Sequence, residues 1–238
     1  MKTGFTVLGI ISSANACSLS AAMVREALKG AKEEGAAVRE IYLPDQRIGY
    51  CTGCRQCLNG RCPQNDDFKA IRDELYKADG IIWGSPTYGG LPNAIMKNLI
   101  DRLGIYEAST SSLGGKYMAG IAAANNKSLA KKVAKQLALF GANGTFLRSY
   151  ASGYLGVGSL NRKKSSEGSA SQEKARELGR KIARDIRQEK AYPMQNIMGR
   201  LRAGLLLKPI FSKFILMNKG GETKLIYENL RERGLIAE

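Results

Sequence analysis

The chain has 238 residues, 44% of them hydrophobic and 24% charged, so it can hold one domain of about 150–200 residues and an additional segment. It contains no histidine, which excludes histidine-based catalytic triads and histidine-liganded metals. The net charge of +16 lies almost wholly in the second half: residues 1–110 carry 13 basic and 12 acidic side chains, and the rest carries 24 and 9. This excess can attract nucleotide phosphates, an acidic protein or anionic lipid, or it can be an ordinary solvated surface. We expect no specific nucleic-acid binding.

The N-terminal segment is typical of a buried strand rather than of a secretion signal. Residues 5–11 are mostly apolar, but the run is short, Gly9 breaks it, and Ser12 and Ser13 interrupt it before Cys17. No apolar stretch is long enough to span a bilayer. We therefore expect a cytoplasmic protein, in a reducing compartment where closely spaced cysteines indicate metal binding or catalysis rather than disulfides.

Short apolar runs alternate with longer amphipathic ones along the chain. The pattern predicts strands over residues 5–11, 37–42, 80–84, 116–124 and 145–150. It predicts helices over residues 18–34, 65–75, 92–103, 128–140 and 171–188, with loops at 85–90 and 158–171. Five strands alternating with five helices predict a doubly wound α/β fold, in which a five-stranded parallel sheet is covered on both faces. We assign residues 1–190 to this domain and residues 191–238 to a basic amphipathic extension.

Four of the five cysteines lie in one loop, residues 51–62, at spacing C-x2-C-x2-C-x4-C: Cys51, Cys54, Cys57 and Cys62. Four thiolates this close together can hold an iron–sulfur cluster, and Pro63 follows the last one as in bacterial ferredoxins. One set of four predicts a single [4Fe-4S] cluster. Two alternatives stay open: metal-free cysteines that pack near another cofactor, and a structural zinc site, whose two ligand pairs usually lie farther apart.

Ligands of such folds bind at the carboxyl ends of the strands, which directs attention to residues 12–20, 85–91 and 124–127. The first loop is rich in serine and precedes a helix, an arrangement that suits a single phosphate group. It matches neither the Walker nor the G-x-G-x-x-G pattern. In the second loop, Gly89 and Gly90 let the backbone approach a flat ring, and Tyr88 can stack on it. Beyond this loop, Lys97, Asp101 and Arg102 are interpreted as charges on the exposed side of a helix.

Three motifs, in this order, resemble the NAD(P)H-dependent FMN reductases of the flavodoxin-like class, and more closely their iron–sulfur flavoproteins. They are the serine-rich first loop, the cysteine run leading into Asp66 and Asp67, and Gly-Ser-Pro-x-Tyr followed by Lys-x-x-x-Asp-Arg. Together they cover roughly residues 5–150.

The resemblance implies a flavodoxin-like FMN domain and assigns three groups of contacts. The FMN phosphate would be held by Ser13, Asn15, Ser18, Leu19 and Ser20. The ring would lie against Pro86, Thr87, Tyr88, Gly89 and Gly90, and its pyrimidine edge would meet Asn125 and Asn126.

The predicted function is that of an FMN-dependent oxidoreductase in which the flavin joins NAD(P)H or ferredoxin to an acceptor, with the cluster as a one-electron carrier. No side chain is needed as a catalytic acid or base. The alternative within this class is a cluster-free NAD(P)H:FMN or quinone reductase. The alternative from another class is a non-enzymatic interaction module that acts through the basic extension.

The extension carries apolar residues at helical spacing through residues 194–219, interrupted at Pro209, and ends in a short charged tail. Basic residues stud the same stretch. A helix of this kind can lie on an anionic membrane or dock on a neighbouring subunit or partner protein. The resemblance favours a homo-oligomer, dimer or tetramer, and a protein electron carrier is a further expected partner.

Overall fold

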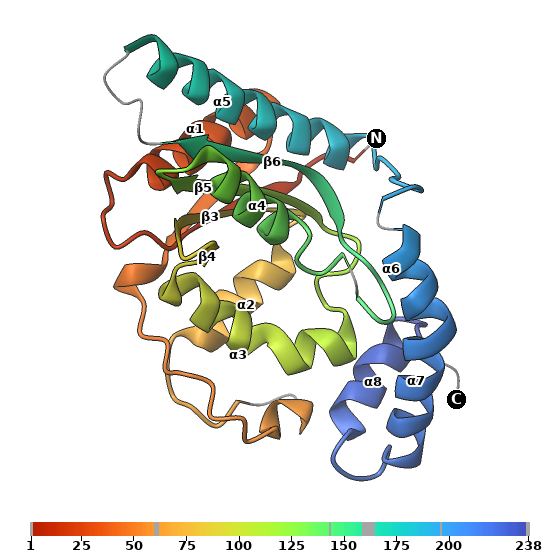
Figure 1. Cartoon of the computed structure of the whole chain (residues 1–238). Coiled ribbons are helices and arrows are strands. Elements are labelled where there is room, and N and C mark those ends of the chain that lie inside the picture. The colour runs from red at the N-terminus through yellow and green to blue at the C-terminus, as the bar shows by residue number, and fades with distance from the viewer. Residues whose placement is uncertain (1, 60–61, 143, 159–164, 196, 237–238) are drawn as a thin grey trace.

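The computed structural model describes residues 2–59, 62–142, 144–158, 165–195 and 197–236. Its centre is a parallel sheet with the strand order β2-β1-β3-β5-β6 (Figure 1). The strands are β1 (Thr6–Ile11), β2 (Ala37–Tyr42), β3 (Gly80–Tyr88), β5 (Tyr117–Ala124) and β6 (Tyr150–Gly158). This is the flavodoxin-like order, and it confirms the predicted fold class.

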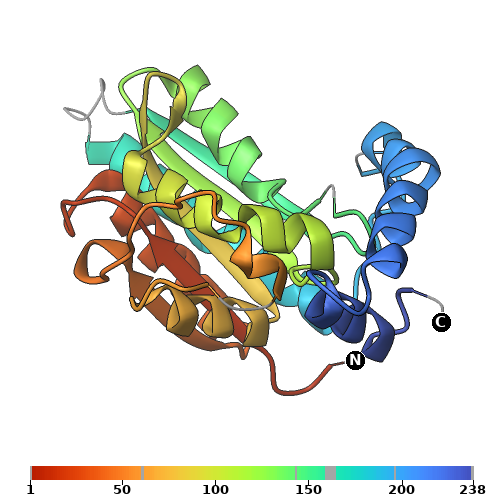
Figure 2. The same ribbon diagram turned by 90° about the horizontal axis from the view of Figure 1, so that it is seen from below.

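Helices cover both faces of the sheet, as Figure 2 shows from below. One face carries α1 (Leu19–Glu33) and α5 (Ser165–Arg187), and the other carries α2 (Phe68–Lys77), α3 (Ala94–Thr110) and α4 (Lys127–Ala138). Alternate residues of a strand point to opposite faces, so Val7 packs under α1 while Leu8 packs toward α2 and α3. Both faces are therefore buried, as a parallel sheet requires.

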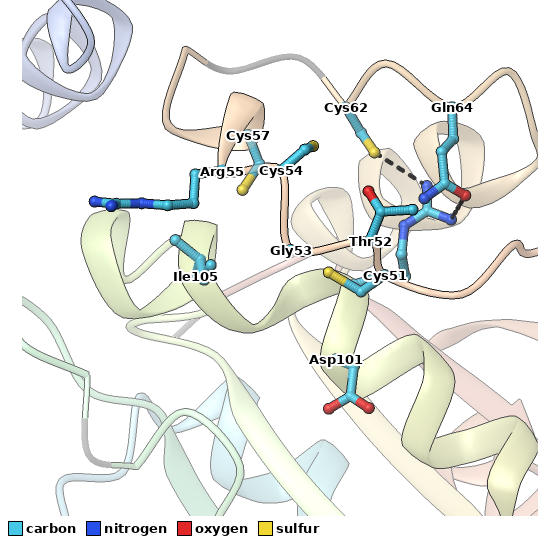
Figure 3. A pocket seen from close by; sticks show the side chains of 11 residues that line it. Cys51, Thr52, Gly53, Cys54, Arg55, Cys57, Cys62, Gln64, Asp101 and Ile105 are labelled. Carbon is cyan, nitrogen blue, oxygen red and sulfur yellow. Dashed lines mark hydrogen bonds between the residues drawn. The ribbon is translucent and has the colours of Figure 1, made fainter.

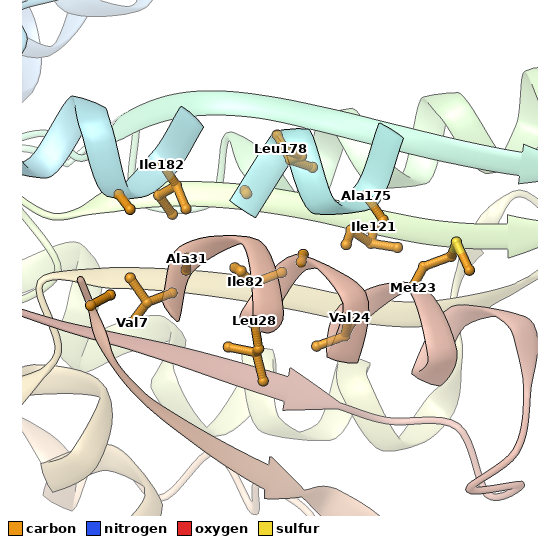
Figure 4. Packing of buried hydrophobic residues seen from close by; sticks show 14 of the residues in the cluster. Val7, Met23, Val24, Leu28, Ala31, Ile82, Ile121, Ala175, Leu178 and Ile182 are labelled. Atoms are coloured by element: carbon orange, nitrogen blue, oxygen red, sulfur yellow. The ribbon is translucent and has the colours of Figure 1, made fainter. Parts of the chain in front are cut away.

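The α1–α5 pair shows how closely the helices pack (Figure 4). Val24, Leu28 and Ala31 of α1 lie against the sheet beside Leu178 and Ile182 of α5. A Cβ atom at Gly179 would fall 1.7 Å from the carbonyl oxygen of Ala27, so only glycine allows this approach.

Two predicted boundaries around β3 are wrong. Residues 85–88 were expected in a loop, but β3 continues to Tyr88 and pairs with the short antiparallel β4 (Leu91–Pro92). Pro92 therefore lies in β4 rather than at the start of a helix. Asn93 caps α3 instead, with its side-chain oxygen accepting a hydrogen bond from the Met96 amide.

The fifth predicted strand is also misplaced, because the structure has a strand at Tyr150–Gly158 rather than at residues 145–150. Three glycines in β6 remove the apolar alternation that reveals a strand. Close packing requires glycine at position 156, since a Cβ there would fall 2.3 Å from the backbone nitrogen of Lys131 in α4. The predicted loop at residues 158–171 partly covers positions outside the described residues, and α5 already begins at Ser165.

The C-terminal segment is helical, as expected, but differs in two details. A continuous helix runs through α6 (Ile197–Arg202), a π-helical turn (Ala203–Leu207) and α7 (Lys208–Met217). Pro209 does not break it, and the proline directly follows the π-helical turn, where the backbone hydrogen-bond spacing already departs from that of an α-helix. The expected charged tail forms a further helix, α8 (Lys224–Glu232). Within the described residues, no helix combines the length and apolar character needed to cross a bilayer.

Candidate functional site

Three loops meet at the carboxyl edge of the sheet. They follow β1, β3 and β5, which are neighbours, with Ile11 opposite Gly84 and Pro86 opposite Ala123. A Cβ at Gly90 would lie 3.8 Å from Leu129 Cδ2, so the β3–β4 turn also adjoins the first turn of α4. The residues predicted in the three loops therefore lie along one edge of the molecule.

A buried polar network joins the first two loops. Ser12 Oγ donates to Asn93 Oδ1 at 2.7 Å, and Asn93 Nδ2 donates to the Ser12 carbonyl at 2.8 Å. The backbone N–H of Asn93 donates to Ser85 Oγ at 3.1 Å. Ser12 and Ser85 lie in the predicted ligand loops but were assigned no contact, and Asn93 was not predicted as part of the site. An asparagine just before a helix was the available indication, and it was obscured because Pro92 was interpreted as the helix start.

The predicted phosphate loop surrounds the N-terminus of α1. Ser18 is the N-cap and accepts from the Ala21 amide at 3.2 Å, while its Oγ lies 3.3 Å from Ser20 Oγ. Ser13 is buried and Asn15 is exposed, with its side-chain oxygen accepting from the Cys17 amide. Leu19 and Ser20 are the first two residues of the helix, where backbone N–H groups have no intrahelical acceptor. The N-terminus of α1 therefore presents amides and hydroxyls of the kind that bind phosphate.

Two side chains from outside the loop hold it in place. An Arg25 guanidinium nitrogen donates to the Ala16 carbonyl at 2.5 Å, and the guanidinium also pairs with Glu40. The Tyr42 hydroxyl donates to the Ala14 carbonyl at 3.0 Å. Neither supporting residue was predicted. Tyr42 reaches the loop because β2 pairs beside β1, and Arg25 lies in α1, where its guanidinium is also held by Glu40 of β2.

The predicted ring-binding turn begins at the end of β3 and leads into β4. Gly89 and Gly90 have φ angles of 58° and 76°, which favour glycine, and the Tyr88 side chain is 68% exposed. Thr87 differs from its neighbours: its hydroxyl oxygen is buried, yet among the described residues it has no hydrogen-bond partner. Buried hydroxyls are almost always satisfied, so the Thr87 hydroxyl is a donor available to a ligand at this edge.

The third loop lies at the end of β5. Asn126 is the N-cap of α4 and its side-chain oxygen accepts from the amides of Ser128 and Leu129. Asn125 is exposed beside it. The structure thus places both predicted residues at the shared edge, with the oxygen of Asn126 committed to its own helix.

The four loop cysteines line one small cavity of about 20 Å³, roughly the space of a single water. Cys51 and Cys54 are exposed, whereas Cys57 and Cys62 are half-buried. Their sulfur atoms point in different directions (Figure 3). Among the described residues, no three Cys, Asp or Glu side chains are arranged to hold one metal ion. Four free thiols on one cavity fit a cluster chemically, but their sulfur atoms would have to turn toward one another to hold it.

The thiols affect one another's ionisation. Burial raises the pKa of Cys57, and negative charge on Cys51, Cys54 and Cys62 raises it further. The pKa of Cys54 is lowered, first by the backbone N–H of Gln56 and then by the Thr52 side chain. The other three sulfurs therefore lie close enough to Cys57 to raise its pKa.

Arg102 anchors this loop from below, which corrects its predicted exposed position. Its side chain is 1% exposed and donates to both carboxylate oxygens of Asp66, at 2.6 and 3.1 Å. It also donates to the Gly49 carbonyl, to Gln64 and, at 3.3 Å, to Cys62 Sγ. Burial acts to raise the pKa of Asp66, but hydrogen bonds from Arg102 and two backbone amides outweigh it and hold that pKa below its usual range.

Lys97 and Asp101, the other two charges of that motif, lie on the exposed side of α3 and pair with each other, as predicted. The helical spacing could not reveal the burial of Arg102, because its partners Asp66 and Cys62 come from a distant loop.

Comparisons with known proteins agree with this architecture. The family model described as NADPH-dependent FMN reductase matches residues 5–157. An iron-sulfur flavoprotein of Methanocaldococcus jannaschii is 41% identical over 97 residues, 40% of this chain and 50% of that protein. One from Archaeoglobus fulgidus is 44% identical over 71 residues, 30% of this chain and 35% of that protein. The chain thus spans about half or less of the length of these curated relatives.

Among solved structures, a flavodoxin, WrbA-like protein from Agrobacterium tumefaciens superposes with a TM-score of 0.51 at 19% identity. The superposition covers 79% of this chain and 100% of that one, a likeness that concerns the fold alone. The family match extends over more than half of the chain and ends inside β6, so it contains all three edge loops and the cysteine loop. The chain belongs to the NADPH-dependent FMN reductase family.

Proposed function

We propose that this protein is an FMN-dependent oxidoreductase whose flavin binds at the carboxyl edge of β1, β3 and β5. The observation that carries the proposal is the buried, unpartnered hydroxyl of Thr87, which lies between the glycine turn and the end of the sheet. The family match and the amides at the start of α1 support the same location.

The chain's own residues would bind and orient the cofactor. Ser13, Ser18 and Ser20 and the first amides of α1 would hold the phosphate, with Asn15 beside them. The segment from Pro86 to Gly90 would support the ring, to which Thr87 would donate a hydrogen bond. When bound, FMN would supply hydride or single-electron transfer, and no side chain need act as acid or base.

The second part of the proposal is that Cys51, Cys54, Cys57 and Cys62 hold a [4Fe-4S] cluster. It is supported by the relatives' description as iron-sulfur flavoproteins and by four free thiols on one cavity. A bound cluster would supply one-electron transfer. Arg102, which donates to Cys62 Sγ, would stabilise negative charge on that sulfur.

The donor is proposed to be NAD(P)H or a reduced ferredoxin-type carrier. NADPH is the donor in the family's description, and basic side chains of the second half could attract either nucleotide phosphates or an acidic carrier protein. A homo-oligomer is proposed as the functional assembly. A cluster-free NAD(P)H:FMN or quinone reductase is the competing function.

One anaerobic experiment tests both parts. The protein is reconstituted with FMN, iron and sulfide, its iron and flavin are counted, and its visible spectrum is followed after adding NADH, NADPH or reduced ferredoxin. We expect one flavin and four irons per chain, and flavin bleaching with at least one donor. Flavin reduction without iron would support the cluster-free reductase. A chain that takes up no FMN would contradict the proposal.

A further inference from the structure

The helix that runs from Ile197 to Met217 presents an uncovered apolar surface. We call this surface the outer stripe. Large apolar side chains on it are 41–75% exposed; they are Ile197, Met198, Leu201, Leu205, Leu206, Ile210, Phe214 and Met217. In Figures 1 and 2 the helix stands at the side of the molecule, away from the sheet. Scattered exposed apolar residues are ordinary, but a contiguous row of this kind marks an interaction surface.

The π-helical turn keeps the row continuous. In an α-helix, steps of three or four residues stay on one face, as from Met198 to Leu201 and on to Leu205. The next step, from Leu205 to Ile210, is five residues and crosses the π turn Ala203–Leu207, whose wider spacing accommodates it. The row then resumes at Phe214. The backbone irregularity thus aligns the apolar residues of α6 with those of α7.

The opposite side of the helix is attached to the body of the protein. Ile215 is 1% exposed and packs with Leu58 of the cysteine loop and with Ile226 and Leu230 of α8. Just before the helix, Gln195 forms two hydrogen bonds of 2.8 Å with the backbone of Ala151 in β6. The helix is held at both ends, so the exposure of its outer side is a fixed property of the fold.

The charge of this segment is of one sign. Between residues 191 and 221 the sequence has no aspartate or glutamate and five basic residues: Arg200, Arg202, Lys208, Lys213 and Lys219. In a symmetric contact between two copies, these cations would lie opposite the same cations of the partner, and the like charges would repel. A surface that is both apolar and cationic instead matches an anionic lipid interface, where acyl chains meet the apolar residues and headgroups meet the bases.

We propose that this helix docks the protein on an anionic membrane surface, with its axis in the plane of the interface. Its 21 residues extend about 30 Å, so the whole outer stripe can lie in the headgroup region at once. Because the inner side contacts Leu58, docking places the cysteine loop behind the helix, one helix diameter (~10 Å) from the interface.

The test is sedimentation of the full chain with vesicles of neutral phosphatidylcholine, with and without 30% phosphatidylglycerol. Binding is expected only to the anionic vesicles, and it should weaken as salt is raised. Removing three exposed charges, in Arg202→Gln/Lys208→Gln/Lys213→Gln, should reduce partitioning about 100-fold. The matched control, Lys131→Gln/Lys132→Gln/Lys135→Gln, removes three exposed lysines from α4 and should bind as the wild type does.

A second variant tests the apolar contribution. Leu201→Ser/Leu205→Ser/Ile210→Ser changes only exposed residues, so folding should persist, and anionic-vesicle binding should be lost. Two outcomes would overturn the proposal. One is the absence of binding by the wild type. The other is an apolar variant that binds vesicles normally but changes the oligomer size in light scattering, which would assign the outer stripe to a contact between subunits.

Discussion

Thr87 and Arg102 are the two side chains on which the proposed site depends most. Thr87 has a buried hydroxyl that has no hydrogen-bond partner in the described part of the protein. The Arg102 guanidinium, in contrast, donates several hydrogen bonds to the cysteine loop and the residues beside it. Neither property follows from the residue type. Each arises because the fold buries a polar group: the Thr87 hydroxyl without a hydrogen-bond partner among the described residues, and the Arg102 guanidinium with several.

Thr87→Val removes the unpartnered hydroxyl while preserving the shape of the side chain. The variant should unfold with the same free energy as the wild type, or up to about 1 kcal/mol more, because no hydrogen bond to the protein is lost. Its affinity for FMN should fall roughly fivefold, the equivalent of one hydrogen bond. Denaturant unfolding and FMN fluorescence titration measure the two quantities.

The matched control is Thr145→Val, because Thr145 Oγ1 donates to the Ala108 carbonyl at 3.0 Å at the opposite end of α3. That variant should lose stability and keep its FMN affinity. If both variants bound FMN as tightly as the wild type, Thr87 would have no part in the site.

Arg102→Met should release the cysteine loop. Breaking a buried ion pair leaves Asp66 without its partner and should lower the free energy of unfolding by about 3 kcal/mol. The four loop thiols should also react faster with a thiol reagent in the metal-free protein. Lys97→Met, which breaks the exposed Lys97–Asp101 pair on the same helix, should cost less than about 1 kcal/mol. Equal effects of the two substitutions would show that Arg102 is not an anchor.

At the scale of elements, α3 links the two parts of the site. Asn93 of the edge network caps its N-terminus, and Arg102 lies in its middle. At its C-terminal end, the Thr110 carbonyl accepts a hydrogen bond from Arg233 of the C-terminal segment. Near that end, burial raises the pKa of Glu107 to about 7, although one carboxylate oxygen accepts from the Leu113 amide. The second oxygen has no hydrogen-bond partner in the described part of the chain.

Glu107 should make stability depend on pH. Because its folded pKa lies above the unfolded value of 4.5, the folded protein holds more protons between pH 4.5 and about 7, and stability falls as the pH rises through that window. Glu107→Gln should therefore match the wild type near pH 5 and exceed it near pH 8, by up to about 3 kcal/mol. Parallel profiles for wild type and Glu107→Gln would refute this assignment.

Elements with strong periodicity were predictable from the sequence, and glycine-rich or tertiary features were not. The residues of β2 were predicted without error, and α1 was predicted to within a residue, because apolar spacing and an N-cap serine define them locally. β6 was misplaced because its glycines admit the close packing of α4 and α5. The edge loops were found from residue type and position, whereas the supporting Tyr42 and Arg102 act across the fold and leave no local pattern.

At the scale of the whole molecule, the C-terminal helices and the cysteine loop form one packed unit. Leu58 is 6% exposed beneath Ile215 and α8, and Arg233 donates to the carbonyls of Thr110 and Ser111 at the end of α3. The segment beyond residue 192 is thus structurally joined to the loop proposed to carry the cluster.

Truncation after Tyr192 should expose that loop. Without α7 and α8, Leu58 loses its cover, so the neighbouring Cys57 thiol should be modified several-fold faster by a thiol reagent, as mapped by mass spectrometry. Cys17 is already exposed at the start of α1 and provides the internal control, because its rate should not change. An unaltered rate at Cys57 would mean that the C-terminal helices do not shield the loop.

The crystal structure of the protein with FMN tests the central claim most directly. We expect the isoalloxazine ring against the segment from Pro86 to Gly90, a hydrogen bond from Thr87 to the ring, and the phosphate at the N-terminus of α1. Flavin density at any other surface, or strand ends closed over by the protein's own side chains in crystals grown with saturating FMN, would contradict the account.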